Sequence, residues 1–245
     1  MRFSASFLDT LARACYNICK REKEDHLLKI FDLTHTIRAD MPVYPGTEPP
    51  VLENANTYEK DGFKETKLSM FSHTGTHIDP PAHLFAGKTT LDAFPISQFI
   101  GKALVIDCRR LGEGEAITMR ELARYGDAVA KAEFLLFCTG WDEKWGTPDY
   151  FGDYPCIDGD VLDLILAGNY KGIGFDVISL DAMHRDPLGR HRILFSQKEI
   201  INIENLTGLQ ALTDGTLWNF ACLPIKTENA DGAPVRAVAW KEETL

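Results

Sequence analysis

Three histidines and an aspartate fall within the eleven residues HTGTHIDPPAH, which run from position 73 to position 83. Neutral imidazole nitrogens and carboxylate oxygens are preferred ligands of catalytic zinc and similar divalent ions, which usually keep one coordination position open for water. His73, His77 and Asp79 could therefore meet at one ion if the chain folds back between them. Gly75 permits such a turn, because glycine adopts backbone conformations that other residues avoid.

The last histidine of the segment, His83, is separated from Asp79 by the rigid step Pro80-Pro81 and Ala82. We expect this step to move His83 forward, near the ion but not bound to it. A histidine in that position suits proton transfer, since its ordinary pKa lies close to neutral pH. The alternative is a loop whose histidines only bond to the backbone, but burying so many polar groups without a ligand would be unfavourable.

The segment resembles the H-x-G-T-H-x-D-x-P-x-H signature of the metal-dependent cyclase family, whose best-known members are the bacterial kynurenine formamidases. The stretches FDLTHTIRADMPVYPG, TGWDEKWG, GIGFDVISLD and HRILFSQKEIINIENL extend the resemblance over roughly residues 30–240. The resemblance implies that His73, His77 and Asp79 bind a first metal ion and that Asp79 can bridge to a second. It also implies that His83 is the proton donor and acceptor.

A second metal position at His191 and Glu204 is also implied by the resemblance. His184 stands only seven residues before His191, so either imidazole could be the later ligand. The spacing from His191 to Glu204 is one residue longer than in the kynurenine formamidases. A mononuclear site, as in isatin hydrolases, is therefore an alternative, and we expect one or two zinc or manganese ions per subunit.

The reaction that the resemblance implies is metal-dependent hydrolysis of a C–N amide bond in a small aryl formamide or cyclic amide. Metal-activated water would attack the carbonyl, and His83 would deliver a proton to the leaving amine. The chain contains no G-x-S-x-G elbow, so covalent serine catalysis is not expected. N-formylkynurenine is the first candidate substrate. The alternatives are an isatin-like cyclic amide or a lactone, and a metal-binding protein without turnover.

Aromatic residues gather around the predicted site in the sequence, and Tyr44, Phe85 and Trp141 are predicted to contact the substrate. Aromatic side chains are core residues more often than ligand platforms, although a flat aryl or cyclic amide would suit such a platform. Tyr44 stands where the resemblance leads us to expect tryptophan. The sequence therefore determines the reaction class better than it determines the substrate.

The elements that must position these residues are predicted to be both strands and helices. Buried strands are predicted at 103–108, 133–140 and 173–180 from their apolar runs. Thr118 and Glu121 stand in capping-box register before a helix that ends near Gly126, and a second helix runs from about Asp158 to about Gly168. This strand-rich α/β pattern is compatible with the swivelling β/β/α domain that the resemblance implies.

The chain is predicted to divide into an N-terminal helical extension, 1–28, and a cyclase-like hydrolase domain, 29–245. Within the extension, Phe7, Leu11, Cys15 and Cys19 recur at helical spacing and form an apolar stripe. Such a stripe needs a packing partner. We expect the extension to dock on the body or on a neighbouring subunit.

The composition excludes several classes of partner. The formal net charge is −10 and no run of Lys and Arg occurs, which argues against nucleic-acid binding. No apolar run approaches the roughly 18 residues of a membrane helix, no signal peptide is recognisable, and a cytoplasmic location is expected. The six cysteines are too sparse for a disulfide framework. The predicted partners are a small-molecule substrate and, by resemblance, further copies of the chain in a homodimer or homotetramer.

Overall fold

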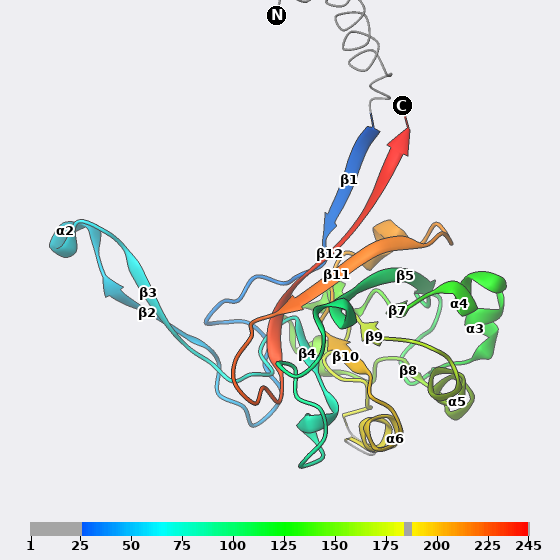
Figure 1. Ribbon diagram of the computed structural model, residues 1–245. Coiled ribbons are helices and arrows are strands. Elements are labelled where there is room, and N and C mark those ends of the chain that lie inside the picture. Colours follow the sequence, from blue (N-terminus) through cyan, green and yellow to red (C-terminus); the bar gives the residue numbers. More distant parts are fainter. Residues whose placement is uncertain (1–25, 184–187, 245) are drawn as a thin grey trace, which may run out of the picture. The chain divides into compact units, whose positions relative to one another are not determined.

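The computed structural model describes residues 26–183 and 188–244 (Figure 1). The described chain divides into a body, Phe31–Ala239, and a smaller unit formed by residues 26–30 and 240–244. Within the described residues, no helix combines the length and the hydrophobicity that a bilayer crossing requires.

The main sheet has eight strands in the order β1-β12-β11-β5-β7-β9-β10-β4. Strands β5, β7, β9 and β10 run parallel to one another, whereas β5 pairs antiparallel with β11. Strand β4 pairs antiparallel with both β10 and β12, so the sheet closes on itself. The bounds are β1 His26–Asp32, β4 His77–Asp79, β5 Ile100–Asp107, β7 Phe134–Cys138, β9 Gly172–Phe175, β10 Ile201–Glu204, β11 Trp218–Pro224 and β12 Ala233–Thr244.

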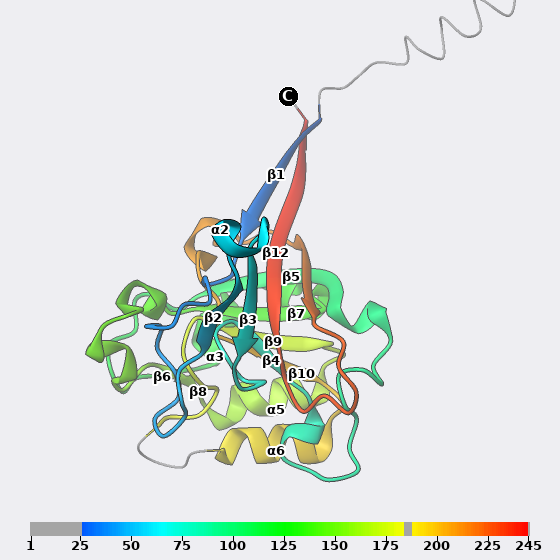
Figure 2. The same ribbon diagram turned by 90° about the vertical axis from the view of Figure 1, so that its left-hand side faces the viewer.

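Two small sheets accompany the main one. Strands β6 (Ala116–Ile117) and β8 (Cys156–Ile157) pair in parallel. Strands β2 (Val51–Asn56) and β3 (Glu65–Ser69) form an antiparallel arm with the short helix α2 (Tyr58–Asp61) at its tip. The arm projects to the left in Figure 1 and toward the viewer in Figure 2, and nearly all its residues are exposed.

Two of the helices, α3 and α5, agree with the predictions from the sequence, whereas α4 and α6 were not predicted. Helix α3 (Met119–Ala123) begins with the complete capping box of Thr118 and Glu121, as predicted, and α4 (Asp127–Lys131) follows Gly126. Asp158 caps α5 (Gly159–Ala167), which ends at Gly168, also as predicted. The last helix is α6 (Gly189–Gln197).

Two predicted boundaries differ from the structure. Residues 1–25 of the predicted helical extension lie outside the described residues, while residues 26–28, which the prediction assigned to it, belong to β1. The strand predicted through residue 180 ends at Phe175. Directly after this end, the Asp176 carboxylate accepts hydrogen bonds from the backbone N–H groups of Thr139 and Gly140, which follow β7.

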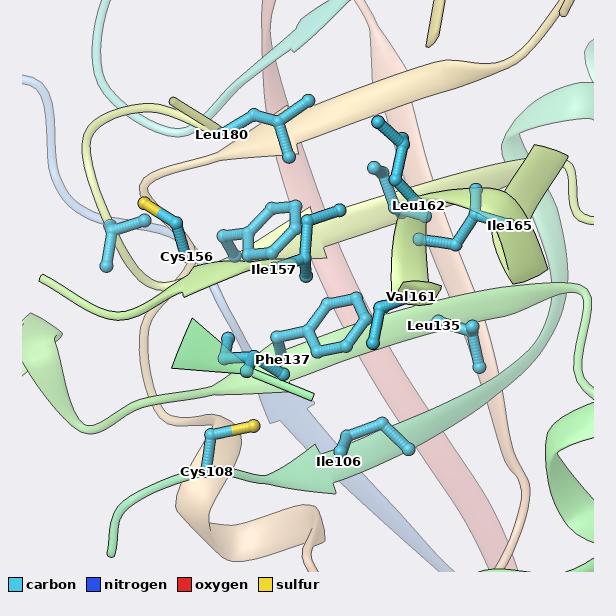
Figure 3. Packing of buried hydrophobic residues seen from close by; sticks show 14 of the residues in the cluster. Ile106, Cys108, Leu135, Phe137, Cys156, Ile157, Val161, Leu162, Ile165 and Leu180 are labelled. Atoms are coloured by element: carbon cyan, nitrogen blue, oxygen red, sulfur yellow. The ribbon is translucent and has the colours of Figure 1, made fainter. Parts of the chain in front are cut away.

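Alternate residues of the strands pack into two hydrophobic cores, as the two-residue period of a strand requires. The inner core is enclosed by the sheet, and its members include Ile78, Ala103, Val105, Phe134, Leu136, Ile201, Ile203 and Phe220. The outer core lies between the sheet and the helices, and its members include Leu104, Ile106, Leu135, Phe137, Phe175, Val161, Ile165 and Phe195. Figure 3 shows side chains of β5 and β7 meeting those of α5 in the outer core.

Gly172 lets β9 lie close to its neighbours. A methyl group added there would come within 2.8 Å of both the Phe134 ring and the Ile201 side chain, and both are fully buried. We therefore expect Gly172→Ala to lower the free energy of unfolding by about 1–3 kcal/mol, because a packed core tolerates added volume poorly. Urea denaturation measures this change.

The matched control is Gly159→Ala in the first turn of α5, where an added methyl group meets nothing within 4 Å. Alanine favours helix over glycine, so this variant should be unchanged or more stable by up to about 1 kcal/mol. Equal urea midpoints for Gly172→Ala and Gly159→Ala would show that the close packing at Gly172 does not limit stability.

Candidate metal centre

The pairing of β4 with β10 places four polar side chains on one face of the sheet. The paired residues are Glu204 with His77, Ile203 with Ile78, and Asn202 with Asp79. The two isoleucines point into the inner core, so the four polar side chains point to the opposite face. All four are buried. Buried polar groups need partners, and these four supply them to one another.

His73 joins this cluster through the turn that precedes β4. Gly75 has a φ of +67°, the left-handed conformation in which the chain folds back as the sequence predicted. His73 Nδ1 consequently lies 2.6 Å from Asp79 Oδ1, and His77 Nε2 lies 3.2 Å from the same oxygen. The three predicted ligands of the first ion therefore lie together, with one donor atom from each within 4.8 Å of the others.

The orientation of the His77 ring is set by the backbone. Its Nδ1–H donates a 2.8 Å hydrogen bond to the Gly75 carbonyl oxygen, so Nε2 faces Asp79. Burial lowers the pKa of His77, but the carboxylates of Asp79 and Glu204 outweigh it and raise that pKa to about 9. Burial would raise the pKa of Asp79, but the surrounding imidazoles hold it well below its usual value.

His191 enters the cluster from α6. Its Nε2 lies 3.2 Å from Glu204 Oε1 and 3.5 Å from Asp79 Oδ2, and these three residues form a second group that could hold an ion. Its Nδ1 pairs at 2.7 Å with Asp181 Oδ2, and the Asp181 carboxylate also accepts the backbone N–H groups of Arg190 and His191. His184, the alternative ligand considered above, lies outside the described residues.

His83 ends a short 3₁₀ turn, Pro81–His83, beside the first group. Its ring centroid lies 4.0 Å from that of His73 and 6.4 Å from that of His191. Burial lowers the pKa of His83, so its imidazole is neutral near pH 7 and can accept a proton. His83 also forms a third group with His73 and the exposed Asp231, which the sequence did not indicate.

These histidines face a cavity of about 520 Å³ in the body. Its wall contains Tyr44, Phe71, Ile178 and Leu188 as apolar or aromatic residues, and Ser179 and Asn205 as polar ones. Cavities of this size and mixed lining bind small molecules. Tyr44, which the sequence predicted as a substrate contact, is among these lining residues.

The other two predicted substrate contacts, Phe85 and Trp141, do not line this cavity. Trp141 is buried in the outer core and its Nε1–H donates to the Tyr150 carbonyl oxygen at 2.9 Å. Phe85 packs against the same core. Trp141 is thus a core residue with a satisfied indole N–H, while the partly buried Phe85 packs beside that core, so neither ring lies where the sequence predicted a substrate contact in this cavity.

Three residues of the cluster were not predicted from the sequence. Asp181 orients His191, and Asn202 stands among the carboxylates. Asn205 has a φ of +56° and its Nδ2 donates to the Gly75 carbonyl oxygen at 2.9 Å, which ties β10 to the turn before β4. Only Asn202 had a signal in the sequence, since it alternates with Glu204 in the strand-like segment INIE.

The donor set fits a divalent ion. His77 and His191 each have the outer nitrogen hydrogen-bonded to an oxygen, which is the usual arrangement of metal-ligating histidine, and the inner nitrogens face buried carboxylates. His73, His77 and Asp79 would hold one ion, and Asp79, His191 and Glu204 offer a second set of donor atoms.

Ion binding at this cluster should release protons. With a pKa of about 9, His77 is protonated at neutral pH in the ion-free protein, and an ion must displace that proton. Affinity for Mn²⁺ should therefore rise about tenfold per pH unit between about pH 6.5 and about pH 8.5. Calorimetry in buffers of different protonation enthalpy measures the released proton. An affinity that is flat over this range would contradict the expected protonation of His77.

Comparison with known proteins finds relatives over most of the chain. The family model named Cyclase matches residues 31–182. Kynurenine formamidase from Bacillus thuringiensis (strain Al Hakam) is 32% identical over 210 residues, which cover 84% of this chain and 95% of the relative. Kynurenine formamidase from Bacillus anthracis is 32% identical over 213 residues, which cover 86% of this chain and 96% of the relative.

Solved structures are similar over nearly the whole chain. Isatin hydrolase A from Labrenzia aggregata, bound to benzyl benzoate, superposes with a TM-score of 0.79 at 24% identity and covers 96% of this chain and 99% of that one. An isatin hydrolase bound to the product analogue thioisatinate has a TM-score of 0.77 at 21% identity, and the match covers 98% of this chain and 100% of that one. These structures share the fold. On its sequence and its fold, this chain belongs to the cyclase family.

Proposed function

We propose that this protein is a metal-dependent hydrolase that cleaves the C–N amide bond of a small aryl formamide or cyclic amide. The observation that carries the proposal is that the neutral His83 and the first group of metal-binding residues, His73, His77 and Asp79, line one cavity. The kynurenine formamidase relatives support N-formylkynurenine as the first candidate substrate. The similarity to isatin hydrolase structures supports a cyclic amide as the alternative.

The ion would be held by His73, His77 and Asp79, with zinc and manganese as the candidates. When bound, a divalent ion supplies the Lewis acid that polarises the amide carbonyl and makes water more acidic. Three protein ligands would leave a coordination position for water, which is typical of catalytic rather than structural sites.

The remaining chemistry belongs to side chains of the cavity. His83 accepts the proton of the attacking water and returns it to the leaving nitrogen, without which an amide nitrogen departs poorly. Tyr44, Phe71 and Ile178 offer apolar surface for a flat ring beside the reacting amide. The proline step before His83 holds its backbone in place, because Pro81 is buried and begins the 3₁₀ turn.

Replacing His83 by glutamine tests the assignment of proton transfer. We expect His83→Gln to lower kcat for N-formylkynurenine, isatin or an aryl formamide by about 10²–10⁴-fold, while the bound metal measured by mass spectrometry is unchanged. The matched control is His35→Gln, because His35 does not line the cavity. Its ring stacks on that of Trp145 with the ring centroids 3.9 Å apart. The activity of this control variant should stay within a few-fold of the parent.

Two outcomes would reject the proposed function. One is purified protein that binds no divalent ion and hydrolyses none of these amides after addition of zinc or manganese. The other is a His83→Gln variant with full turnover, which would assign the proton transfer to another group. A protein that binds metal tightly and hydrolyses none of the substrates would support the non-catalytic alternative.

We further propose that the functional protein is a homodimer or homotetramer joined through the arm formed by β2 and β3. An isolated two-stranded arm is marginally stable in water, and this one exposes Val51, Leu52, Tyr58, Phe63 and Leu68. Leu52 and Leu68 stand directly opposite each other and so share one face of the arm. A second copy of the chain would cover that apolar face.

Changing the apolar face should dissociate the assembly. We expect the double variant Leu52→Lys/Leu68→Lys to elute as a monomer in size-exclusion chromatography with light scattering, because it places two charges in the proposed contact. The control is Glu53→Gln/Lys67→Gln, a pair that faces the other side of the arm. If the parent protein is a monomer, or if both double variants keep its mass, the arm is not the contact.

A further inference from the structure

The Asn202 side chain stands where the second group of metal-binding residues converges. Its amide nitrogen Nδ2 lies 3.0 Å from Asp79 Oδ2, 2.9 Å from Glu204 Oε1 and 3.2 Å from His191 Nε2. These three atoms are the ones that Asp79, Glu204 and His191 would offer to a second ion. Asn202 is fully buried and lies opposite Asp79 in the sheet.

The two carboxylates determine which end of the amide faces them. The amide group has two N–H bonds, and one is directed at each carboxylate oxygen. Turning the amide over would place Oδ1 against both carboxylate oxygens, where like partial charges repel. Asn202 Oδ1 has no hydrogen-bond partner among the described residues, so the amide is held in this orientation through its nitrogen.

The position of the amide nitrogen is incompatible with an ion at the second group. His191 Nε2 lies 3.5 Å from Asp79 Oδ2 and 3.2 Å from Glu204 Oε1. A zinc ion bound to all three atoms would lie about 2 Å from each, and every such point is within about 3 Å of the amide nitrogen. The two N–H hydrogens point into this space, so they would meet the cation directly.

We propose that Asn202 closes the second metal position, so that this chain holds a single divalent ion on His73, His77 and Asp79. The amide satisfies the buried Asp79 and Glu204 oxygens that would otherwise bind a second ion. It also divides the Asp79 carboxylate, with Oδ2 bonded to Asn202 and Oδ1 directed at His73 and His77. Asn202 is thus a positioning residue for a mononuclear centre.

This inference rests on the proposed metal-dependent function but concerns the number of ions. The test is to load the full-length protein with excess Mn²⁺, remove free ions by gel filtration, and measure bound manganese by mass spectrometry. Electron paramagnetic resonance distinguishes an isolated Mn²⁺ ion from a coupled pair. We expect one isolated ion per chain in the parent protein and two coupled ions in Asn202→Ala.

Asn202→Asp is the second variant, because it keeps the size of the side chain and replaces the N–H donors by a ligand oxygen. It too should bind two ions. The control is Asn219→Ala, since Asn219 lies on β11 and accepts a hydrogen bond from Lys102 there, and it should retain one ion. Circular dichroism establishes that each variant is folded.

Two bound ions per chain in the parent protein would overturn the proposal. If, in addition, Asn202→Ala bound only one ion, Asn202 would be a metal ligand instead. One ion in the parent and in both folded variants would also overturn it, because Asn202 would not be the group that excludes the second ion. Neither result depends on turnover. A protein that binds no ion would instead reject the proposed function itself.

Discussion

The candidate centre depends on the register of β4 against β10. Ile78 and Ile203 lie opposite each other and point into the inner core, where burial of each isoleucine contributes about 1.5–3 kcal/mol. Side chains alternate along a strand, so a slip of β4 by one residue would bring His77 and Asp79 into the apolar core and away from Asn202 and Glu204. Hydrophobic burial on one face of the sheet therefore holds the polar cluster on the other.

The imidazoles of His77 and His191 are each oriented by a partner outside the centre. The Gly75 carbonyl holds His77, and Asp181 holds both the ring of His191 and the start of α6. Asn205 binds the same Gly75 carbonyl from the end of β10. Because these partners come from the turn before β4, the loop before α6 and the end of β10, the centre forms only when the body is folded. A site held this way needs little rearrangement to bind an ion.

Several helices and strands could be predicted from interactions between residues close together in the sequence. The capping box of Thr118 and Glu121 and the Asp158 cap predicted where α3 and α5 begin, because these bonds lie within one turn of helix. The apolar runs predicted β5 and β7, because a strand buried on both faces needs continuous apolar residues. The end of β9 at Phe175 was not predicted, since the contacts there, such as those of Asp176 with Thr139 and Gly140, join residues distant in sequence.

The sequence by itself was enough to identify the family and the segment HTGTHIDPPAH. Within its eleven positions lie residues of metal-ligand type, a glycine turn and a proline step. Tertiary structure decided what depends on long-range packing. It placed Trp141 in the core and Tyr44 at the cavity, and it brought His191, Asp181 and Asn202 around Asp79. The physical reason is that spacing limits which near neighbours can meet, whereas strand pairing and burial select which distant side chains share a face.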